Sequence, residues 1–209
     1  MMSHTLNKMN ELLGPKHLVS AKGLHAQKNP TLLIIEDLAP LGFRMADRLS
    51  GLDLTHSIMA LHGLARFHAA SVALCEKVDF QLCLYTSPAI DLLYFLSTSP
   101  SPDVIENKKS VLLNEYLSTL SATMKQLGCK TQPPTMEKLN AMLKERASYG
   151  MIASFTVLPI VLCCKTEAKD LDEIMSSGTF VNPGLKSENY KKLMSKRLLQ
   201  YDEIGLLDL

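Results

Sequence analysis

Two acidic residues in the segment Val78–Phe95 have the residue type and setting for metal-dependent phosphate chemistry. Asp79 follows Val78 in a short segment of strand character, and Asp91 sits twelve residues later in an apolar run after Ser87-Pro88. A phosphate-bound Mg²⁺ is a hard cation that takes carboxylate oxygens as ligands and needs them rigidly aimed, as at a strand end. The pattern therefore predicts Asp79 as a metal ligand and Asp91 as a brace for a neighbouring loop. The structural alternatives are a turn residue for Asp79 and an acid complementing a helix dipole for Asp91.

Other polar residues offer weaker candidates. Glu36 and Asp37 follow a β-favouring run and are placed either to edge an adenine pocket through their backbone groups or to form a solvated turn. His68 lies on the apolar face of a predicted helix, which favours a hydrogen-bonded core residue over a ligand or base. His62-Gly63 is followed by Leu64 rather than by an acid, so we reject this pair as a catalytic site. The sequence contains no glycine-rich phosphate loop and no HExxH motif.

Composition narrows the possible partners and the number of domains. The chain has 209 residues, of which 46% are hydrophobic and 21% charged, so it is long enough to bury the core of one globular body. The net charge is +1 without a block of Lys or Arg, which indicates neither nucleic acid nor an anionic membrane as a partner. A complete two-lobed phosphotransferase would be longer. We therefore expect one domain, or one lobe with an appendage.

Cysteines and apolar segments indicate the compartment. The five cysteines are an odd number without CxxC spacing, and the N-terminal residues are polar without the apolar core of a secretory leader. A reducing cytoplasm is the predicted location. The most apolar stretch, Met151–Cys164, has 14 residues and contains Pro159, so it is too short to span a bilayer. It predicts a buried helix and the turn that ends it.

The elements around these candidates follow from periodicity and capping signals. Thr31–Ile35 predicts a strand buried on both faces, and residues 1–30 are weakly patterned. Ser101, Pro102 and Gly128 have the types expected at the two ends of a helix. Helices are predicted over 53–76, 89–96, 102–127, from 135 past 150 towards 159, and 188–201. The expected fold class is α/β in the α+β sense, a mainly helical lobe with a remnant of sheet, organised as an N-terminal remnant (1–30) and a partial domain (31–209).

One junction in this pattern is unusual. The helix ending near Glu76 meets the strand-like segment at Val78 with almost no connector, although such links usually need about 2–6 residues. This predicts a deletion between Lys77 and Val78.

Several blocks of the sequence together resemble one protein family. They are LLIIEDLAPLGF, ADRLSGLDLTH, LARFHAASVAL, VDFQLCLYTSPAIDLLYFL, YGMIASFTVLPIVL and the terminal GLLDL. Over roughly Pro30–Leu209 the chain is similar to the insect ecdysteroid kinase-like proteins, also called the CHK kinase-like or juvenile hormone-inducible family. These are relatives of choline kinases and aminoglycoside phosphotransferases.

The resemblance implies a protein kinase-like fold and transfer of phosphate from ATP, with Mg²⁺, to a hydroxyl of a small apolar molecule such as a steroid. By position in the family's motifs, it places Ile35, Glu36 and Asp37 beside the adenine. It makes Asp79 the metal-binding acid, and Asp91 the acid that steadies the catalytic loop. His68 matches a family core motif to which we assign no chemical role.

The departures from the family pattern carry as much meaning as the matches. The family's catalytic His-Gly-Asp, followed by Trp and Asn, should precede Val78 and is absent. The glycine-rich segment and the ATP-contacting Lys have no counterpart before Thr31. Loss of a general base alone costs about 10²- to 10⁴-fold in rate. We therefore expect no useful phosphoryl transfer.

Three explanations stay open from the sequence. The chain is a family member disabled as a pseudokinase, a splice isoform or an incomplete gene model; or it is a non-catalytic protein that binds a small apolar molecule; or it is an enzyme completed by a partner chain that supplies the missing loop.

Overall fold

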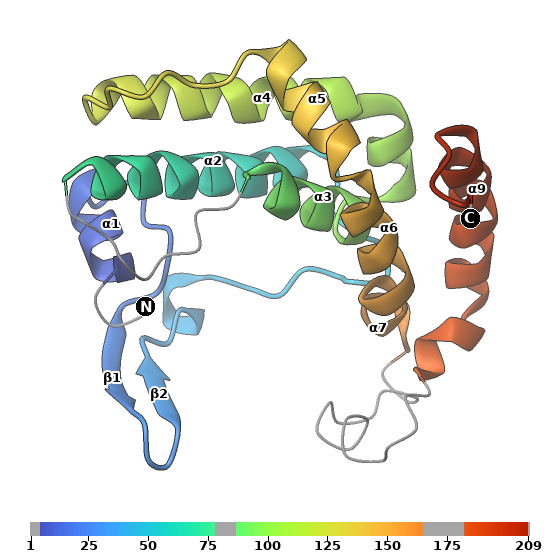
Figure 1. Ribbon diagram of the computed structural model, residues 1–209. Helices are drawn as coiled ribbons and strands as arrows, with labels where there is room; N and C mark the ends of the chain where they lie inside the picture. The colour runs from blue at the N-terminus through green and yellow to red at the C-terminus, as the bar shows by residue number, and fades with distance from the viewer. Residues whose placement is uncertain (1–4, 78–86, 165–181, 209) are drawn as a thin grey trace. The chain divides into compact units, whose positions relative to one another are not determined.

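The structure, a computed structural model (Figure 1), describes residues 5–77, 87–164 and 182–208. The chain divides into two compact units, each assembled from segments distant in sequence. The first unit is Met1–Met45, Thr55–Tyr85 and Lys109–Glu137, and the second is Ala46–Leu54, Thr86–Lys108 and Lys138–Leu209. The described elements are, in chain order, α1 (Thr5–Leu13), β1 (Gly23–Gln27), β2 (Leu32–Ile35), the 3-10 helix η1 (Ala39–Leu41), α2 (Leu54–Lys77), α3 (Ala89–Thr98), α4 (Pro102–Gln126), α5 (Met136–Glu145), α6 (Ala147–Thr156), α7 (Leu158–Leu162), the 3-10 helix η2 (Pro183–Lys186) and α9 (Glu188–Glu203).

The first unit is built around α2 and the second half of α4, which lie side by side and run in the same direction (Figure 1). Small side chains dominate the buried face of α2 and let the neighbouring helices approach closely. The buried residues of this face are Ser57, Leu61, Ala65, Ala69, Ala70, Ala73 and Leu74. The predicted helix over 53–76 is thereby confirmed.

Helix α1 covers the C-terminal half of α2. Met9 and Leu13 form a buried apolar cluster with Ala70 and Leu74, and Phe67 packs against it. Each large apolar side chain buried in this way contributes about 1.5–3 kcal/mol to folding. Leu54–Cys75 is also long and apolar enough, by length and composition alone, to cross a membrane, but core helices of soluble proteins pass the same test.

Local capping signals set both ends of α4. The helix begins at Pro102, as predicted, with Asp103 in its first turn. At its end Gly128 has a φ of 69°, which favours glycine. The Cys129 N–H donates to the Met124 carbonyl at 3.0 Å and the Gly128 N–H to the Lys125 carbonyl at 3.1 Å. This pair of bonds is a Schellman motif, which satisfies carbonyls that the helix leaves open.

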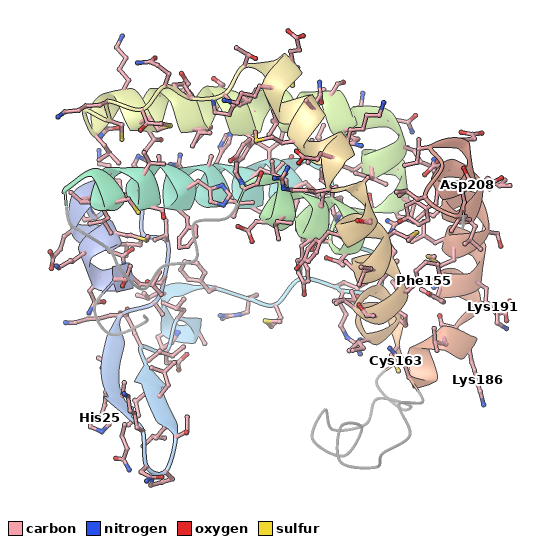
Figure 2. All side chains as sticks on the ribbon, viewed as in Figure 1. His25, Phe155, Cys163, Lys186, Lys191 and Asp208 are labelled. Carbon is pink, nitrogen blue, oxygen red and sulfur yellow. The ribbon has the colours of Figure 1, made fainter. Side chains whose placement is uncertain are left out.

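Strands β1 and β2 form an antiparallel hairpin, the two-stranded sheet of the described residues. Figure 2 labels His25 on it. The predicted strand in Thr31–Ile35 is confirmed, but its predicted burial on both faces is wrong, because the four side chains of β2 are 41–45% exposed. The physical reason is that its one neighbour in this sheet is β1, whose five residues are themselves mostly exposed.

The second unit packs α3 against α6; α7 contacts α6, and η2 and α9 pack against α7 and against each other. The long helix predicted from 135 towards 159 is three helices, interrupted at Arg146 and Val157. Pro159 accounts for the second interruption, since it lacks an N–H and its ring clashes with the carbonyl four residues earlier. Burial of Met151–Cys164 is only partly confirmed, because Ile152 is 54% exposed and Phe155, labelled in Figure 2, is 40% exposed.

A segment before α2 is tied into the second unit through its backbone. The Leu52 N–H donates to the Ser99 carbonyl and the Ser101 N–H donates to the Leu52 carbonyl, both at 2.9 Å. Gly51 has a φ of 72°, and a Cβ there would lie 2.8 Å from the Ser101 nitrogen. A glycine is therefore required at this close approach.

The described chain is thus mostly helical with a small antiparallel sheet. This agrees with the predicted mainly helical α+β class.

Candidate functional site

The residues predicted beside the adenine lie at the end of β2, in the first unit. Ile35 is 45% exposed. The Glu36 N–H donates to the Lys22 carbonyl at 2.9 Å, and the Glu36 carboxylate accepts from the Lys22 N–H at 3.4 Å. The Asp37 carboxylate accepts from the Ala39 N–H at 2.9 Å and so begins the turn η1. Both acids therefore hold local backbone in place.

Asp91 lies in the first turn of α3, in the second unit, and is half-buried. The helix start is formed by Ser87, whose hydroxyl accepts from the Ala89 N–H at 3.3 Å and whose carbonyl accepts from the Ile90 N–H. An acid in this turn complements the positive end of the helix dipole. Its predicted second role, bracing the catalytic loop of the family, stays a prediction.

The predicted metal ligand, Asp79, lies outside the described residues, as does most of the segment that leads from it to Ser87. Within residues 5–77, 87–164 and 182–208, no three His, Cys, Asp or Glu side chains are grouped closely enough to hold a metal ion. The described acids thus do not form a metal centre by themselves.

Two histidines of α2 bond to α4. His68 Nδ1 and the Tyr116 hydroxyl are 2.8 Å apart, and their rings meet edge to face with centroids 5.9 Å apart. The predicted hydrogen bond of His68 is confirmed, but its side chain is half-buried rather than in the core. His62 Nε2 lies 2.9 Å from a Glu115 carboxylate oxygen. His62-Gly63 stands in the middle of α2, as expected when we rejected it as a catalytic pair.

The sequence did not reveal a buried polar cluster that joins α3, α6 and α9. Arg197 of α9 is 8% exposed, and its Nη1 donates to the Ser97 carbonyl of α3 at 2.6 Å and to the Ser154 hydroxyl of α6 at 2.8 Å. The Ser154 hydroxyl also lies 3.0 Å from the Gly150 carbonyl and 2.8 Å from the Tyr201 hydroxyl. One side chain therefore joins three helices.

The hydrogen atoms of this cluster can be assigned by counting. A serine hydroxyl has one hydrogen and two lone pairs. The Ser154 hydroxyl accepts from Arg197 and donates to Gly150, so Tyr201 donates to its second lone pair. Tyr190 donates separately to the Ser154 carbonyl at 3.2 Å. Every polar atom named here then has a partner, as buried polar groups require.

Burial changes the acidity of two members of the cluster. It lowers the pKa of the Arg197 guanidinium below its usual value, and the nearby Tyr201 and Tyr190 hydroxyls partly offset this. Burial, followed by the neighbouring Tyr201, raises the pKa of Tyr190 above 10.0, and Arg197 partly offsets that shift. Arg197 stays protonated at any physiological pH, because its ordinary pKa is so high.

A signal for Arg197 was present in the sequence. Tyr190, Met194 and Arg197 are spaced four and three residues apart, so the arginine occupies an inward position of the amphipathic helix α9. A charged residue at such a position indicates a buried hydrogen-bonded group. The partners themselves, which come from α3 and α6, could not be read from α9.

The structure defines a mostly helical protein in which His62 and His68 bond to α4 and Asp91 lies in the first turn of α3. The model of the ecdysteroid kinase-like family matches residues 1–78 and 75–129. These two pieces cover more than half of the chain, and the chain therefore belongs to the ecdysteroid kinase-like family. No curated protein and no solved structure matches it.

Proposed function

We propose that this member of the ecdysteroid kinase-like family does not itself transfer phosphate. In the family that the sequence resembles, a catalytic His-Gly-Asp supplies the base that takes the proton of the acceptor hydroxyl. The sequence has one His-Gly pair, His62-Gly63, and it is followed by Leu64. That pair belongs to the middle of α2, where His62 is bonded to Glu115.

The observation that carries this proposal is the place where the family match is interrupted. The two matched pieces meet at residues 75–78. The same place is the Lys77–Val78 junction, where the sequence passes from a helix to a strand-like segment without a connector. The missing connector and the divided family match therefore both support a deletion between Lys77 and Val78, where the family's catalytic segment belongs.

The remaining elements of the family's site enter the same proposal. Asp79 is the residue left to bind Mg²⁺, Asp91 the brace, and Ile35, Glu36 and Asp37 the edge of the adenine pocket in a kinase-like fold. Without the base and the second metal ligand, ATP and Mg²⁺ lose the contacts that position and stabilise the transferred phosphoryl group. Loss of the base alone lowers the rate by about 10²- to 10⁴-fold.

The decisive experiment measures Mg²⁺-dependent ADP release and acceptor phosphorylation by the purified full chain, with ATP and an ecdysteroid. We expect no turnover above that of the Asp79→Asn variant. Asp103→Asn is the matched control, since this exposed acid begins α4 and accepts a hydrogen bond from Asn107 at 2.9 Å. Turnover that Asp79→Asn abolishes and Asp103→Asn preserves would contradict the proposal.

A gain-of-function variant sharpens this test. Inserting a family catalytic segment with His-Gly-Asp between Lys77 and Val78 restores the missing base at the point of interruption. ADP release by the insertion variant alone would support our interpretation that this segment is what the chain lacks. Activity that arises instead on co-expression with a second family member would support completion by a partner chain.

If transfer is lost, binding is the remaining function, and the family's acceptors define the ligand class as small apolar molecules such as steroids. Titration of an ecdysteroid without ATP tests this alternative: saturable binding supports it, and a flat titration rejects it without changing the expectation for transfer. We also propose a reducing, cytoplasmic location. The odd number of cysteines and the lack of CxxC spacing in the sequence support it.

A further inference from the structure

A cleft of about 250 Å³ in the first unit is lined mainly by groups that donate hydrogen bonds. Its walls come from the end of α1, the following loop, α2 and α4. The lining residues that carry side-chain donors are His17, Arg66, Ser118, Thr119, Thr123 and Gln126. Among the lining residues that the structure describes there is no Asp or Glu. The cleft therefore has the polarity of a site for a negatively charged molecule.

The wall that carries His17 is held in place by hydrogen bonds. The Asn10 side chain accepts from the Val19 N–H at 2.9 Å and donates to the Ser20 carbonyl and hydroxyl, each at 3.2 Å. The His17 N–H donates to the Gly14 carbonyl at 3.1 Å. The loop is thus fixed onto α1, and α1 is fixed onto α2 by their apolar cluster. A wall that is ordered before binding lowers the entropic cost of binding.

Arg66 is the charged group at the centre of this inference. It is half-buried on α2, and within the residues that the structure describes it makes no hydrogen bond or ion pair. Half-burial removes part of the water around a guanidinium that has five N–H donors. An arginine in this state binds carboxylates and phosphates strongly, through paired, charge-assisted hydrogen bonds.

The hydroxyl-bearing wall on α4 complements Arg66. Ser118, Thr119 and Thr123 of α4 all line the cleft and carry hydroxyls. The hydrogen of the Thr123 hydroxyl is already donated to the Thr119 carbonyl at 2.7 Å, which leaves Ser118 and Thr119 as the hydroxyl donors for a ligand. Four oxygens of a tetrahedral anion can be shared among a guanidinium, an imidazole and hydroxyls, whereas a carboxylate offers two. The volume lies below the roughly 300–1,000 Å³ of sites for drug-sized ligands, so the ligand is small.

We propose that this cleft binds a small phosphate-class anion, either inorganic phosphate or the phosphate group of a small phosphomonoester, with Arg66 as its principal ligand. The site uses no residue of the family's nucleotide or metal positions. Its occupation is therefore independent of whether the chain transfers phosphate.

Calorimetric titration of the full chain with inorganic phosphate and with methyl phosphate tests the proposal, and methanol serves as a neutral comparison. We expect saturable binding of at least one phosphate compound and none of methanol. Tighter binding of methyl phosphate would identify a phosphomonoester as the ligand, and tighter binding of phosphate would identify the free anion. Binding of neither compound, or equal binding of methanol, would overturn the proposal.

Arg66→Gln should weaken phosphate binding by about tenfold or more, since hydrogen bonds to charged groups are the strong ones. Arg146→Gln is the matched control: Arg146 belongs to the second unit, bonds to Glu145 at 2.6 Å and is not among the residues that line the cleft. Its replacement should leave binding unchanged. Thr119→Val keeps the side-chain shape and should weaken binding by about two- to tenfold. If Arg66→Gln does not fold, the phosphate affinity of Thr119→Val tests the site in its place. Equal weakening by Arg146→Gln, or none by Thr119→Val and Arg66→Gln, would reject the site.

Discussion

Polar side chains link helices in both units, but at different depths. Between α2 and α4 of the first unit, the side chains of His62 and Glu115 are 27% and 44% exposed. In the second unit Ser154 is fully buried and Arg197 is 8% exposed. Water can replace a lost partner in the first case but not in the second, where a broken bond leaves a buried group unsatisfied. We therefore expect the buried contacts of Arg197 to stabilise the second unit more than the half-exposed His62–Glu115 pair stabilises the first.

We expect the largest change in the free energy of unfolding from replacing a tightly packed glycine of the second unit, compared with an uncrowded glycine of the first. A Cβ on Gly184 of η2 would lie 1.7 Å from the Pro159 carbonyl oxygen, whereas a Cβ on Gly63 of α2 would meet no atom within 4 Å. Gly184→Ala should lower the free energy of unfolding by about 3 kcal/mol or more, because backbone must move. Gly63→Ala, its control, should raise it by up to about 1 kcal/mol through helix propensity. Denaturant unfolding measures both, and equal signs would contradict the contrast.

Arg197→Lys tests the buried cluster directly. Lysine keeps the charge but not the planar donors that reach the Ser97 carbonyl and the Ser154 hydroxyl, so we expect a loss of about 2–4 kcal/mol. Hydrogen exchange should show reduced protection of α3, α6 and α9. The control is the adjacent Lys196→Gln, which removes an exposed ion pair with Glu106 at 3.0 Å and should cost less than about 1 kcal/mol. Similar losses of unfolding free energy in the two variants would mean that burial of a polar contact does not determine how much it stabilises the protein.

Tyr116→Phe probes the better-buried bond of the first unit. Tyr116 is fully buried and its hydroxyl meets His68 Nδ1 at 2.8 Å, so its removal should cost about 1–2 kcal/mol. Tyr94→Phe, on the exposed Tyr94 of α3, is the matched control and should change the unfolding free energy little. If Tyr116→Phe lowers the unfolding free energy as much as Arg197→Lys does, polar contacts between helices stabilise the two units equally.

Glu115→Gln removes the charge from the exposed pair. The contact is an ion pair only when the His62 imidazole is protonated, and an exposed ion pair contributes about 0–1 kcal/mol and is screened by salt. We therefore expect a loss below about 1 kcal/mol in dilute buffer that vanishes in 1 M salt, as measured by denaturant unfolding at the two ionic strengths. A loss that persists in high salt would show that the pair is held more tightly than its exposure indicates.

The correct predictions from the sequence concern features that depend on residues close together in the chain. The start of α4 at Pro102 and the turn at Gly128 follow from residue types at fixed offsets, so they were predictable within the helix itself. The helical part of 53–76 followed from periodicity in the same way. Family membership followed from several such blocks in a fixed order.

What could not be predicted depends on residues distant in sequence. The run Thr31–Ile35 has the composition of a buried strand, but burial requires covering elements, and the hairpin of the described residues leaves β2 exposed. The buried position of Arg197 likewise depends on its hydrogen bonds to Ser97 and Ser154, which are 100 and 43 residues away in sequence. The predicted metal ligand Asp79 stays a prediction, since it lies outside the described residues.

The smallest effect, zero at neutral pH, concerns Tyr190. Its folded pKa is raised above the unfolded value of 10.0, chiefly by burial. Below pH 10 both states hold the proton, so stability is unchanged; above it the unfolded state loses the proton first, and stability falls as pH rises through the folded pKa. Tyr190→Phe should therefore flatten the alkaline part of the unfolding curve, although it also loses the bond to the Ser154 carbonyl at all pH values. The control is Tyr94→Phe, which should leave that alkaline slope in place. If the unfolding free energy of Tyr190→Phe falls with pH above 10 as steeply as that of the unsubstituted chain, burial in the second unit does not raise the pKa of Tyr190.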